Sequence, residues 1–302
     1  KYNLSNFDLN KYGFNHVTSE KTMGLYQNNN ASQLAILTDG IYNNIDFTVN
    51  TLDNQTSLLN TLSGLNLTYF KRAPSQLFDK DARSLNQRVA KNVSNSNKDF
   101  VTITYRVIAP PHSQLYVSIP NISWSDDNNH SLSITVNGVT RNQVTDNTFD
   151  FFNLGYFETE SMVTIKLSFP GNKAISFDNP SFYALDTQNY QIAMDTINER
   201  DSKVTTSNNK VFVDYSSKTN ASLFFTIPYD KGWTATINHK KVKIQRAQKG
   251  FMKVDVPSGK GEVVLTFIPY GLKTGSLISL LASIIFCCYA YFIRKITVIQ
   301  KR

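Results

Sequence analysis

Cysteine is almost absent from this chain of 302 residues, which contains only Cys287 and Cys288. The two are neighbours inside an uncharged, apolar stretch, where cysteine acts as a small apolar side chain. Adjacent cysteines do not meet the geometry of an unstrained disulfide, so we expect neither a disulfide nor a metal site there. Because disulfides are common in proteins of the endoplasmic reticulum and cell exterior, their absence favours a bacterial protein if the chain is exported.

The sequence also lacks the signatures of common catalytic and cofactor sites. No Gly-rich phosphate loop follows a strand-like segment, and no Gly-X-Ser-X-Gly nucleophile sequence occurs. The histidines stand alone, without a cysteine or an acidic residue at metal-ligand spacing: His16, His112, His130 and His239. We therefore predict no catalytic residue, no metal site and no cofactor within this segment.

The sequence has one long apolar run, residues 275–293. None of its nineteen residues is charged, and nine are Leu, Ile or Phe. At about 1.5 Å per residue, a helix of this length spans roughly 28 Å, close to the hydrocarbon thickness of a bilayer. A buried helix of a soluble core is usually shorter and carries a polar stripe. The run therefore predicts a transmembrane helix.

The charges around this run predict its orientation. Four cations and no acid follow it, whereas residues 260–274 contain two lysines and one glutamate. Because cytoplasmic flanks carry the excess of Lys and Arg, the tail of residues 294–302 is expected in the cytoplasm and the preceding 274 residues outside. A tail-anchored protein with its large domain in the cytoplasm is the alternative, and the charge bias disfavours it.

The remaining composition is that of a folded, multidomain chain. Hydrophobic residues make up 41% and aromatic residues 12%, which is too much for disorder. The first residue is Lys1, and no signal-peptide pattern follows. Since an exported domain needs a segment that exports it, we expect the C-terminal part of a longer membrane protein, with further transmembrane segments upstream.

Residues 1–98 predict a mixed α/β segment ending in a connector. Leu58, Leu59 and Leu62 share one helical face, with Asn54 suited to cap the start and Gly64 just past the end. The very polar residues 71–98 are typical of a connector or an exposed helix.

Residues 99–188 predict an antiparallel β-sandwich domain. From Phe100 onward, apolar and polar residues alternate with the period of half-buried strands, and the pattern recurs up to Phe169. Asn137-Gly138 between two such segments is a strong signal for a two-residue hairpin.

Residues 189–202 predict a linking helix, and residues 203–271 a second, membrane-proximal β-sandwich. Hairpin turns are expected at residues 238–241 and at residues 257–261. Trp233 starts a strand and is predicted to anchor the core of this domain. The fold class is therefore mainly β with some α: antiparallel β-sandwiches, an N-terminal α/β segment and one C-terminal transmembrane helix.

Positive charge is concentrated beside the apolar run. Residues 228–262 hold eight Lys or Arg against three acids, a net charge of +5, whereas residues 1–227 carry −2. Such a surface attracts lipid headgroups, polyprenyl phosphates or phosphate-rich wall polymers, and nucleic acid is not expected outside the cell. A Lys-rich solvated face without a ligand is the alternative. The candidate contacts are Lys240, Lys241, Lys243, Arg246 and Lys249.

Several segments resemble one family of bacterial membrane proteins, the YfhO family. The matching segments are residues 22–26, Asn54-Gln55, and residues 227–234, 250–252, 256–259 and 267–275. Two positions depart from the family pattern: Thr51-Leu52 stands where relatives tend to have Pro-Phe, and Asn238-His239 stands where they have Asp-Gly. The resemblance covers most of this chain but only the C-terminal part of the family's length.

The resemblance implies a function for a longer parent protein. The family is similar to GT-C glycosyltransferases, which take sugar from a polyprenyl-phosphate lipid at the outer face, and some members are implicated in teichoic acid glycosylation. That chemistry would use acidic residues in loops outside this segment. Asp230 is interpreted as ordering the turn before Trp233, not as a catalytic acid. A membrane-anchored binding or structural module without a catalytic role stays open as the alternative.

Overall fold

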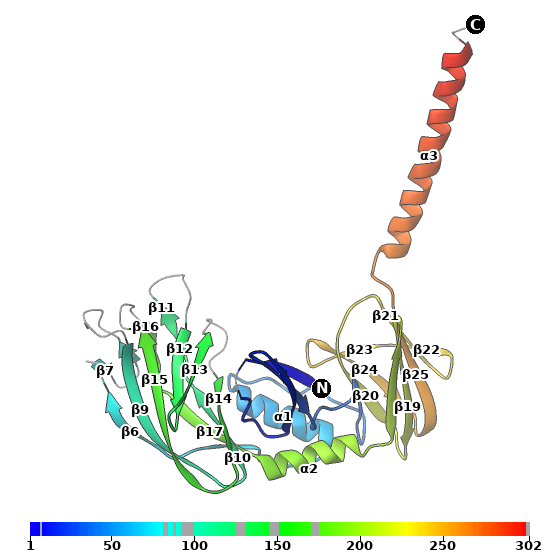
Figure 1. Ribbon diagram of the computed structural model, residues 1–302. Helices are drawn as coiled ribbons and strands as arrows, with labels where there is room; N and C mark the ends of the chain where they lie inside the picture. The colour runs from blue at the N-terminus through cyan, green and yellow to red at the C-terminus, as the bar shows by residue number, and fades with distance from the viewer. Residues whose placement is uncertain are drawn as a thin grey trace. The chain divides into compact units, whose positions relative to one another are not determined.

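The structure is a computed structural model that describes residues 1–6, 8–80, 84–86, 89–91, 100–124, 131–144, 151–170 and 175–299. The described chain consists mostly of antiparallel strands, with helices α1 (Thr51–Ser63), α2 (Thr187–Asn198) and α3 (Leu272–Ile299) (Figure 1). This architecture confirms the predicted mainly β fold class. The chain forms two compact units: unit 1 contains residues 1–32 and 45–196, and unit 2 contains residues 33–44 and 197–302.

Two packed sheets form the centre of unit 1. One sheet has the order β13 (Val139–Val144), β12 (Ser131–Val136), β15 (Ser161–Pro170), β9 (Phe100–Ala109) and β6 (Ser75–Lys80). The other has the order β14 (Phe151–Phe157), β10 (Ser113–Ser118), β17 (Ser181–Asp186) and β5 (Phe70–Arg72). Alternate residues of both sheets share one core, in which the rings of Tyr105 and Phe182 lie 5.1 Å apart. The period-two pattern therefore marks the buried faces.

Two smaller sheets complete unit 1. The first has the order β1 (Tyr2–Ser5), β3 (Met23–Asn28) and β2 (Phe14–Glu20). The second has the order β11 (Ser123–Trp124), β16 (Ile175–Phe177), β8 (Val89–Lys91) and β7 (Ser84–Asn86).

The interpretation of residues 71–98 as a connector or exposed helix is wrong for the described part of that stretch, which forms strands β5 to β8. Strand β6 pairs with β9 between Ser75 and Val107, and the Arg106 guanidinium lies 3.7 Å from the centre of the Phe78 ring. These partners are distant in sequence, so local polarity did not indicate them. Residues 81–83, 87–88 and 92–99 lie outside the described residues.

Helix α1 begins earlier than predicted. Its N-cap is Asn50, whose side chain accepts hydrogen bonds from the amides of Leu52 and Asp53, at 3.0 and 3.3 Å. The predicted cap, Asn54, lies within the helix and instead binds the backbone of Thr48. The predicted end is confirmed, because Gly64 has a left-handed φ of 74° and donates its amide to Asn60.

Unit 2 contains a second pair of sheets. One has the order β18 (Ser202–Ser207), β19 (Lys210–Ser217), β25 (Gly259–Phe267), β21 (Trp233–Ile237) and β22 (Lys240–Val242). The other has the order β23 (Gln245–Ala247), β24 (Phe251–Val256), β20 (Ala221–Pro228) and β4 (Ala35–Leu37). Fully buried Val213, Leu223, Val254 and Leu265 come from both sheets and form one core.

The predicted hairpin at residues 257–261 is wrong. Strand β24 pairs with β20 and β23, whereas β25 pairs with β19 and β21, so the chain between them crosses from one sheet to the other. A hairpin and a crossover between sheets can use the same turn residues. Only the strands with which β24 and β25 pair distinguish the two.

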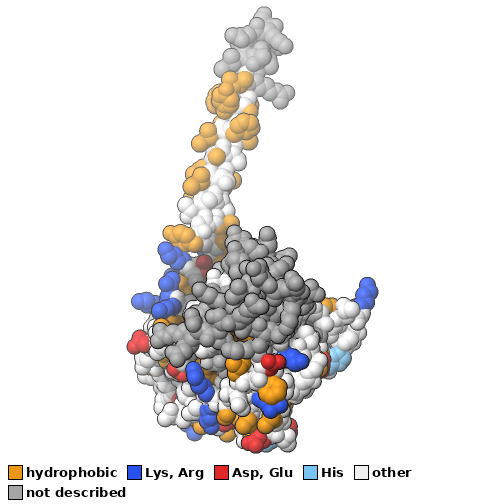
Figure 2. All heavy atoms as spheres, turned by 90° about the vertical axis from the view of Figure 1, so that its left-hand side faces the viewer, with side chains coloured by type: hydrophobic (Ala, Val, Ile, Leu, Met, Phe, Trp, Pro, Cys, Tyr) orange, Lys and Arg blue, Asp and Glu red, His pale blue; other side chains and the backbone are white. Residues whose placement is uncertain are grey.

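Helix α3 follows β25 after residues 268–271. Its segment Leu272–Ile293 has a mean hydropathy of 2.1, is not buried against the rest of the described chain and is long enough to cross a membrane. Hydrophobic side chains project along its exposed surface (Figure 2). By length and composition, this helix fits the transmembrane segment predicted over residues 275–293.

A charged network in unit 2 generates a pH-dependent prediction. Asp255 accepts hydrogen bonds from Ser222, Gln245 and Lys253, at 2.6, 2.5 and 3.0 Å. Burial alone would raise the pKa of Asp255, but these hydrogen bonds and the Lys253 charge outweigh it, and the pKa is lowered.

We expect Asp255→Asn to lower the free energy of unfolding at neutral pH. A carboxyl group with a lowered folded-state pKa stabilises the protein above its unfolded pKa of about 3.9, and this contribution is lost as the pH falls through the folded value. The difference from the original chain should therefore disappear in acid, which urea unfolding across pH measures. A difference that stays constant down to acidic pH would contradict the prediction.

A second prediction concerns Trp233. Its ring is half-buried, packs against the unit 2 core and lies 4.9 Å from the ring of Phe267 on the paired strand. Because it is not fully buried, Trp233→Ala should cost less than the ~3–5 kcal/mol typical of a core tryptophan, but clearly more than a surface change. Tyr270→Ala, at an aromatic residue that is 81% exposed, is the control. Equal urea midpoints for the two variants would show that Trp233 is no anchor.

Candidate functional site

The predicted basic residues lie along one edge of unit 2. Lys240 and Lys241 are on β22, Arg246 is on β23, and Lys243 and Lys249 flank β23 in the chain. Strands β22 and β23 are edge strands of the two different sheets, so the basic segment follows the edge where the chain passes between sheets. All five side chains are exposed.

The turn that presents these lysines is confirmed as a two-residue hairpin between β21 and β22. Asn238 and His239 have φ values of 46° and 67°, and such positive angles at both central positions match the twist of the strands. The Asn238 side chain also accepts the amide hydrogen of Glu262 at 2.9 Å. Local turn chemistry and one hydrogen bond to Glu262 therefore determine where Lys240 and Lys241 lie.

Three lysines at this edge, Lys240, Lys241 and Lys243, keep their charge available to a partner. In the described part of the chain, no carboxylate forms an ion pair with Lys240, Lys241 or Lys243. Arg246 lies with its guanidinium 4.7 Å from the centre of the Tyr229 ring, which orients it without neutralising it. Lysine on an edge strand also prevents pairing with another chain, so these charges protect the edge of the sheet as well.

Asp230 orders the turn that leads into β21. Its side-chain oxygen accepts the amide hydrogen of Gly232 at 2.6 Å, the geometry expected of a turn residue. Gly232 has no room for a side chain, because an added Cβ would lie 2.3 Å from the carbonyl oxygen of Ile268. The structure therefore places Asp230 where its interpretation as a turn residue expects it.

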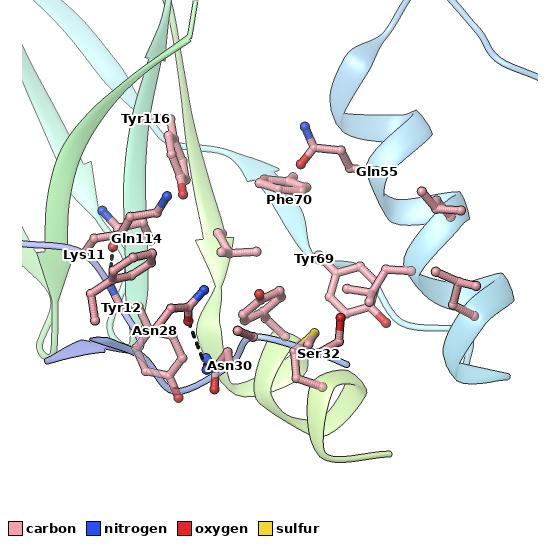
Figure 3. Close-up of a pocket in the computed structure, with 18 residues that line it drawn as sticks. Lys11, Tyr12, Asn28, Asn30, Ser32, Gln55, Tyr69, Phe70, Gln114 and Tyr116 are labelled. Atoms are coloured by element: carbon pink, nitrogen blue, oxygen red, sulfur yellow. Dashed lines mark hydrogen bonds between the residues drawn. The ribbon is translucent and has the colours of Figure 1, made fainter. Parts of the chain in front are cut away.

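Unit 1 contains a cavity that sequence reasoning missed. It has a volume of about 490 Å³ and lies between α1, the β10–β17–β5 part of the sheet, α2 and the N-terminal segment (Figure 3). Its lining is rich in aromatic rings and amides, among them Phe14, Gln55, Tyr69, Phe70, Gln114 and Tyr116. No Asp or Glu of the described part of the chain lines this cavity.

Hydrogen bonds hold several lining residues in place. The fully buried Tyr69, which directly precedes β5, donates its hydroxyl hydrogen to the Asn60 side chain of α1 at 2.8 Å. Gln114 on β10 accepts the Tyr12 amide hydrogen at 2.7 Å and donates to the side chain of Asn153. These bonds belong to the fold, so the cavity is preformed and does not depend on a ligand for its shape.

The electrostatics of the cavity favour neutral or anionic ligands. Burial lowers the pKa of Lys11, whose ammonium lies 5.1 Å from the centre of the Phe14 ring and has no carboxylate partner in the described chain. Burial raises the pKa of Tyr116 to about 12, with a further contribution from Tyr190, so its hydroxyl stays protonated and able to donate.

A second cavity of about 420 Å³ adjoins the first. The two share the lining residues Lys11, Gln55, Phe70 and Tyr116, and the second extends along the start of α1 and the start of β14. Together they form one groove in unit 1, which we call the α1 groove. Its residues come from segments around positions 11, 55, 70, 116 and 153, and no local motif in the sequence connects them.

Comparisons with known proteins agree with the membrane segment. The family model described as bacterial membrane protein YfhO matches residues 1–279. A curated relative, the uncharacterized protein YfhO of Bacillus subtilis (strain 168), is 24% identical over 229 residues. This match covers 72% of the chain and 26% of the relative, so the chain spans about a quarter of the relative's length.

Solved structures give only weak similarity. A cycloisomaltooligosaccharide glucanotransferase of Paenibacillus sp. has a TM-score of 0.24 and 9% identity, over 70% of this chain and 50% of that one. An acetyl xylan esterase from Butyrivibrio proteoclasticus has a TM-score of 0.21 and 11% identity, over 38% and 32%. Scores this low indicate neither a shared fold nor a shared activity. The family match over residues 1–279 is the decisive one, and the chain belongs to the bacterial membrane protein YfhO family.

Proposed function

We propose that this chain is the extracytoplasmic region and last transmembrane helix of a membrane protein that supports the transfer of sugar from a polyprenyl-phosphate lipid to a cell-wall polymer such as teichoic acid. The catalytic acids belong to other parts of the parent protein. This chain contributes recognition of the acceptor polymer near the membrane.

The basic edge of unit 2 is the observation that carries this proposal. Lys240, Lys241 and Lys243 are exposed and free of ion pairs with described carboxylates. The same unit continues into the apolar helix α3. A phosphate polymer or a lipid phosphate near the membrane surface is the ligand that this charge arrangement fits best, because each lysine near an anionic surface contributes about 1 kcal/mol.

The orientation follows the distribution of cations. Residues 294–302 contain four Lys or Arg and no acid, and this excess of cations supports a cytoplasmic tail with both β units outside. Polyprenyl-linked sugars and wall polymers are used on the outer side, where both units would meet them. The proposed function therefore depends on this sidedness.

Charge reversal at the basic edge tests polymer recognition. We expect the variant with Lys240, Lys241 and Lys243 changed to Glu to bind soluble poly(glycerol phosphate) at least roughly tenfold more weakly at low salt. The chain is held in nanodiscs of neutral lipid, and binding is measured by fluorescence titration. Folding should be nearly unchanged, because exposed charges contribute little each.

A matched control uses the same change of charge elsewhere on unit 2. Lys203, Lys210 and Lys218 are also exposed, and their reversal to Glu should reduce binding far less. If both triple variants weaken polymer binding equally, net charge alone explains the effect and the basic edge has no recognition role.

The transfer function has a cellular test of its own. Cells without the parent protein should keep their wall polymer but show a lower ratio of sugar to phosphate in it, measured on the purified polymer. Re-expression should restore the ratio. An unchanged sugar content would contradict the proposed transfer and leave only a binding role.

A further inference from the structure

The α1 groove has the size and continuity of a site for an extended ligand. Its two cavities, of about 490 and 420 Å³, each fall in the range of about 300–1,000 Å³ that is typical of ligand sites. They meet at Lys11, Gln55, Phe70 and Tyr116. A ligand with successive units could occupy both cavities and contact these four side chains at their junction.

The junction offers an aromatic surface beside polar groups. The rings of Phe70 and Tyr116 are half-buried, and their centres lie 6.4 Å apart at an angle of 61°. In Figure 3 both rings lie on the side of the groove that faces Gln55 of α1. Sugar rings present apolar C–H faces and a rim of hydroxyl groups, and therefore fit surfaces where aromatic faces and hydrogen-bonding side chains alternate.

Hydrogen-bonding capacity in the groove exceeds what the fold uses. Gln55 is exposed at the groove and its side-chain amide has no hydrogen bond to the described chain. Asn30, which also lines the groove, is 7% exposed, and its Nδ2 is a buried donor without a partner among the described residues. A buried donor without a partner is destabilising, and a ligand oxygen bound in the groove would satisfy it.

The charges exclude some ligand classes. Among the described residues, no Asp or Glu lines either cavity, whereas Lys11 and Arg141 do. A cationic ligand therefore has no counter-ion here, and an aliphatic chain would leave the groove's polar groups without partners. A ligand rich in hydroxyl oxygens satisfies both constraints.

We propose that the α1 groove binds a carbohydrate chain, with sugar rings packed against Phe70 and Tyr116 and hydroxyl groups bonded to Gln55, the Tyr116 hydroxyl and Lys11. This inference rests on the groove of unit 1 and does not depend on the proposed transfer function.

Two conservative variants test the proposal without disturbing the core. Gln55→Ala removes an exposed amide on a helix, and Tyr116→Phe removes a hydroxyl and keeps the ring. The full chain in neutral-lipid nanodiscs is titrated with a panel of short hexose and N-acetylhexosamine oligosaccharides, and binding is followed by calorimetry. We expect binding of at least one oligosaccharide, weakened roughly tenfold by each variant, with unchanged thermal unfolding.

Controls separate sugar binding from charge effects. Gln188→Ala, at an exposed glutamine of α2 that does not line the groove, should bind as the original chain does. Unglycosylated poly(glycerol phosphate) should be bound independently of Gln55 and should not displace the oligosaccharide. The proposal is overturned if no oligosaccharide binds, if Gln188→Ala weakens binding as much as Gln55→Ala, or if the sugar-free polymer competes for the groove.

Discussion

The organisation of unit 2 depends on the direct continuation of a core strand into the apolar helix. Strand β25 lies inside its sheet between β19 and β21, and only residues 268–271 separate it from α3. Ile268 remains bonded to the backbone of Gly232 at 3.0 Å, so even this short link is tied to the sheet. Four residues reach at most roughly 14 Å. If α3 spans a membrane, the unit 2 sandwich must therefore lie at the membrane surface. Its lysines then lie where the electrostatic potential of the membrane surface is strong.

This constraint suggests a division of tasks between the two units. Unit 2 combines the anchor with an edge where Lys240, Lys241 and Lys243 form no ion pair with a described carboxylate, which suits phosphate. Unit 1 carries a groove that no described Asp or Glu lines and whose aromatic and amide groups suit sugars. A glycosylated phosphate polymer contains both chemistries in one molecule. The curated relative extends well beyond this segment, because the match covers 26% of its length.

The sequence predicted the features that depend on neighbouring residues. Period-two alternation indicated strand β9, turn chemistry indicated the hairpins at Asn137 and Asn238, and uniform apolarity indicated α3. Features that depend on distant partners were missed or wrong: β6 pairs with β9, β4 joins the unit 2 sheet, and β24 and β25 belong to different sheets. The α1 groove was missed for the same reason, because its residues come together only through the sheet and helix packing of unit 1. The basic edge was predicted as a cluster because its residues are close in sequence.

The proposed function depends on the side of the membrane on which the two β units lie. Wall polymers and their sugar donors meet this chain only if these units are outside the cell. The direct measurement is thiol labelling of intact cells that produce the parent protein with Lys241→Cys, in a background where Cys287 and Cys288 are changed to Ser. The account predicts that a membrane-impermeant maleimide labels this exposed position in intact cells, whereas a cysteine added after Arg302 is labelled only after permeabilisation. Labelling at Lys241→Cys only after permeabilisation would place the units in the cytoplasm and contradict the account.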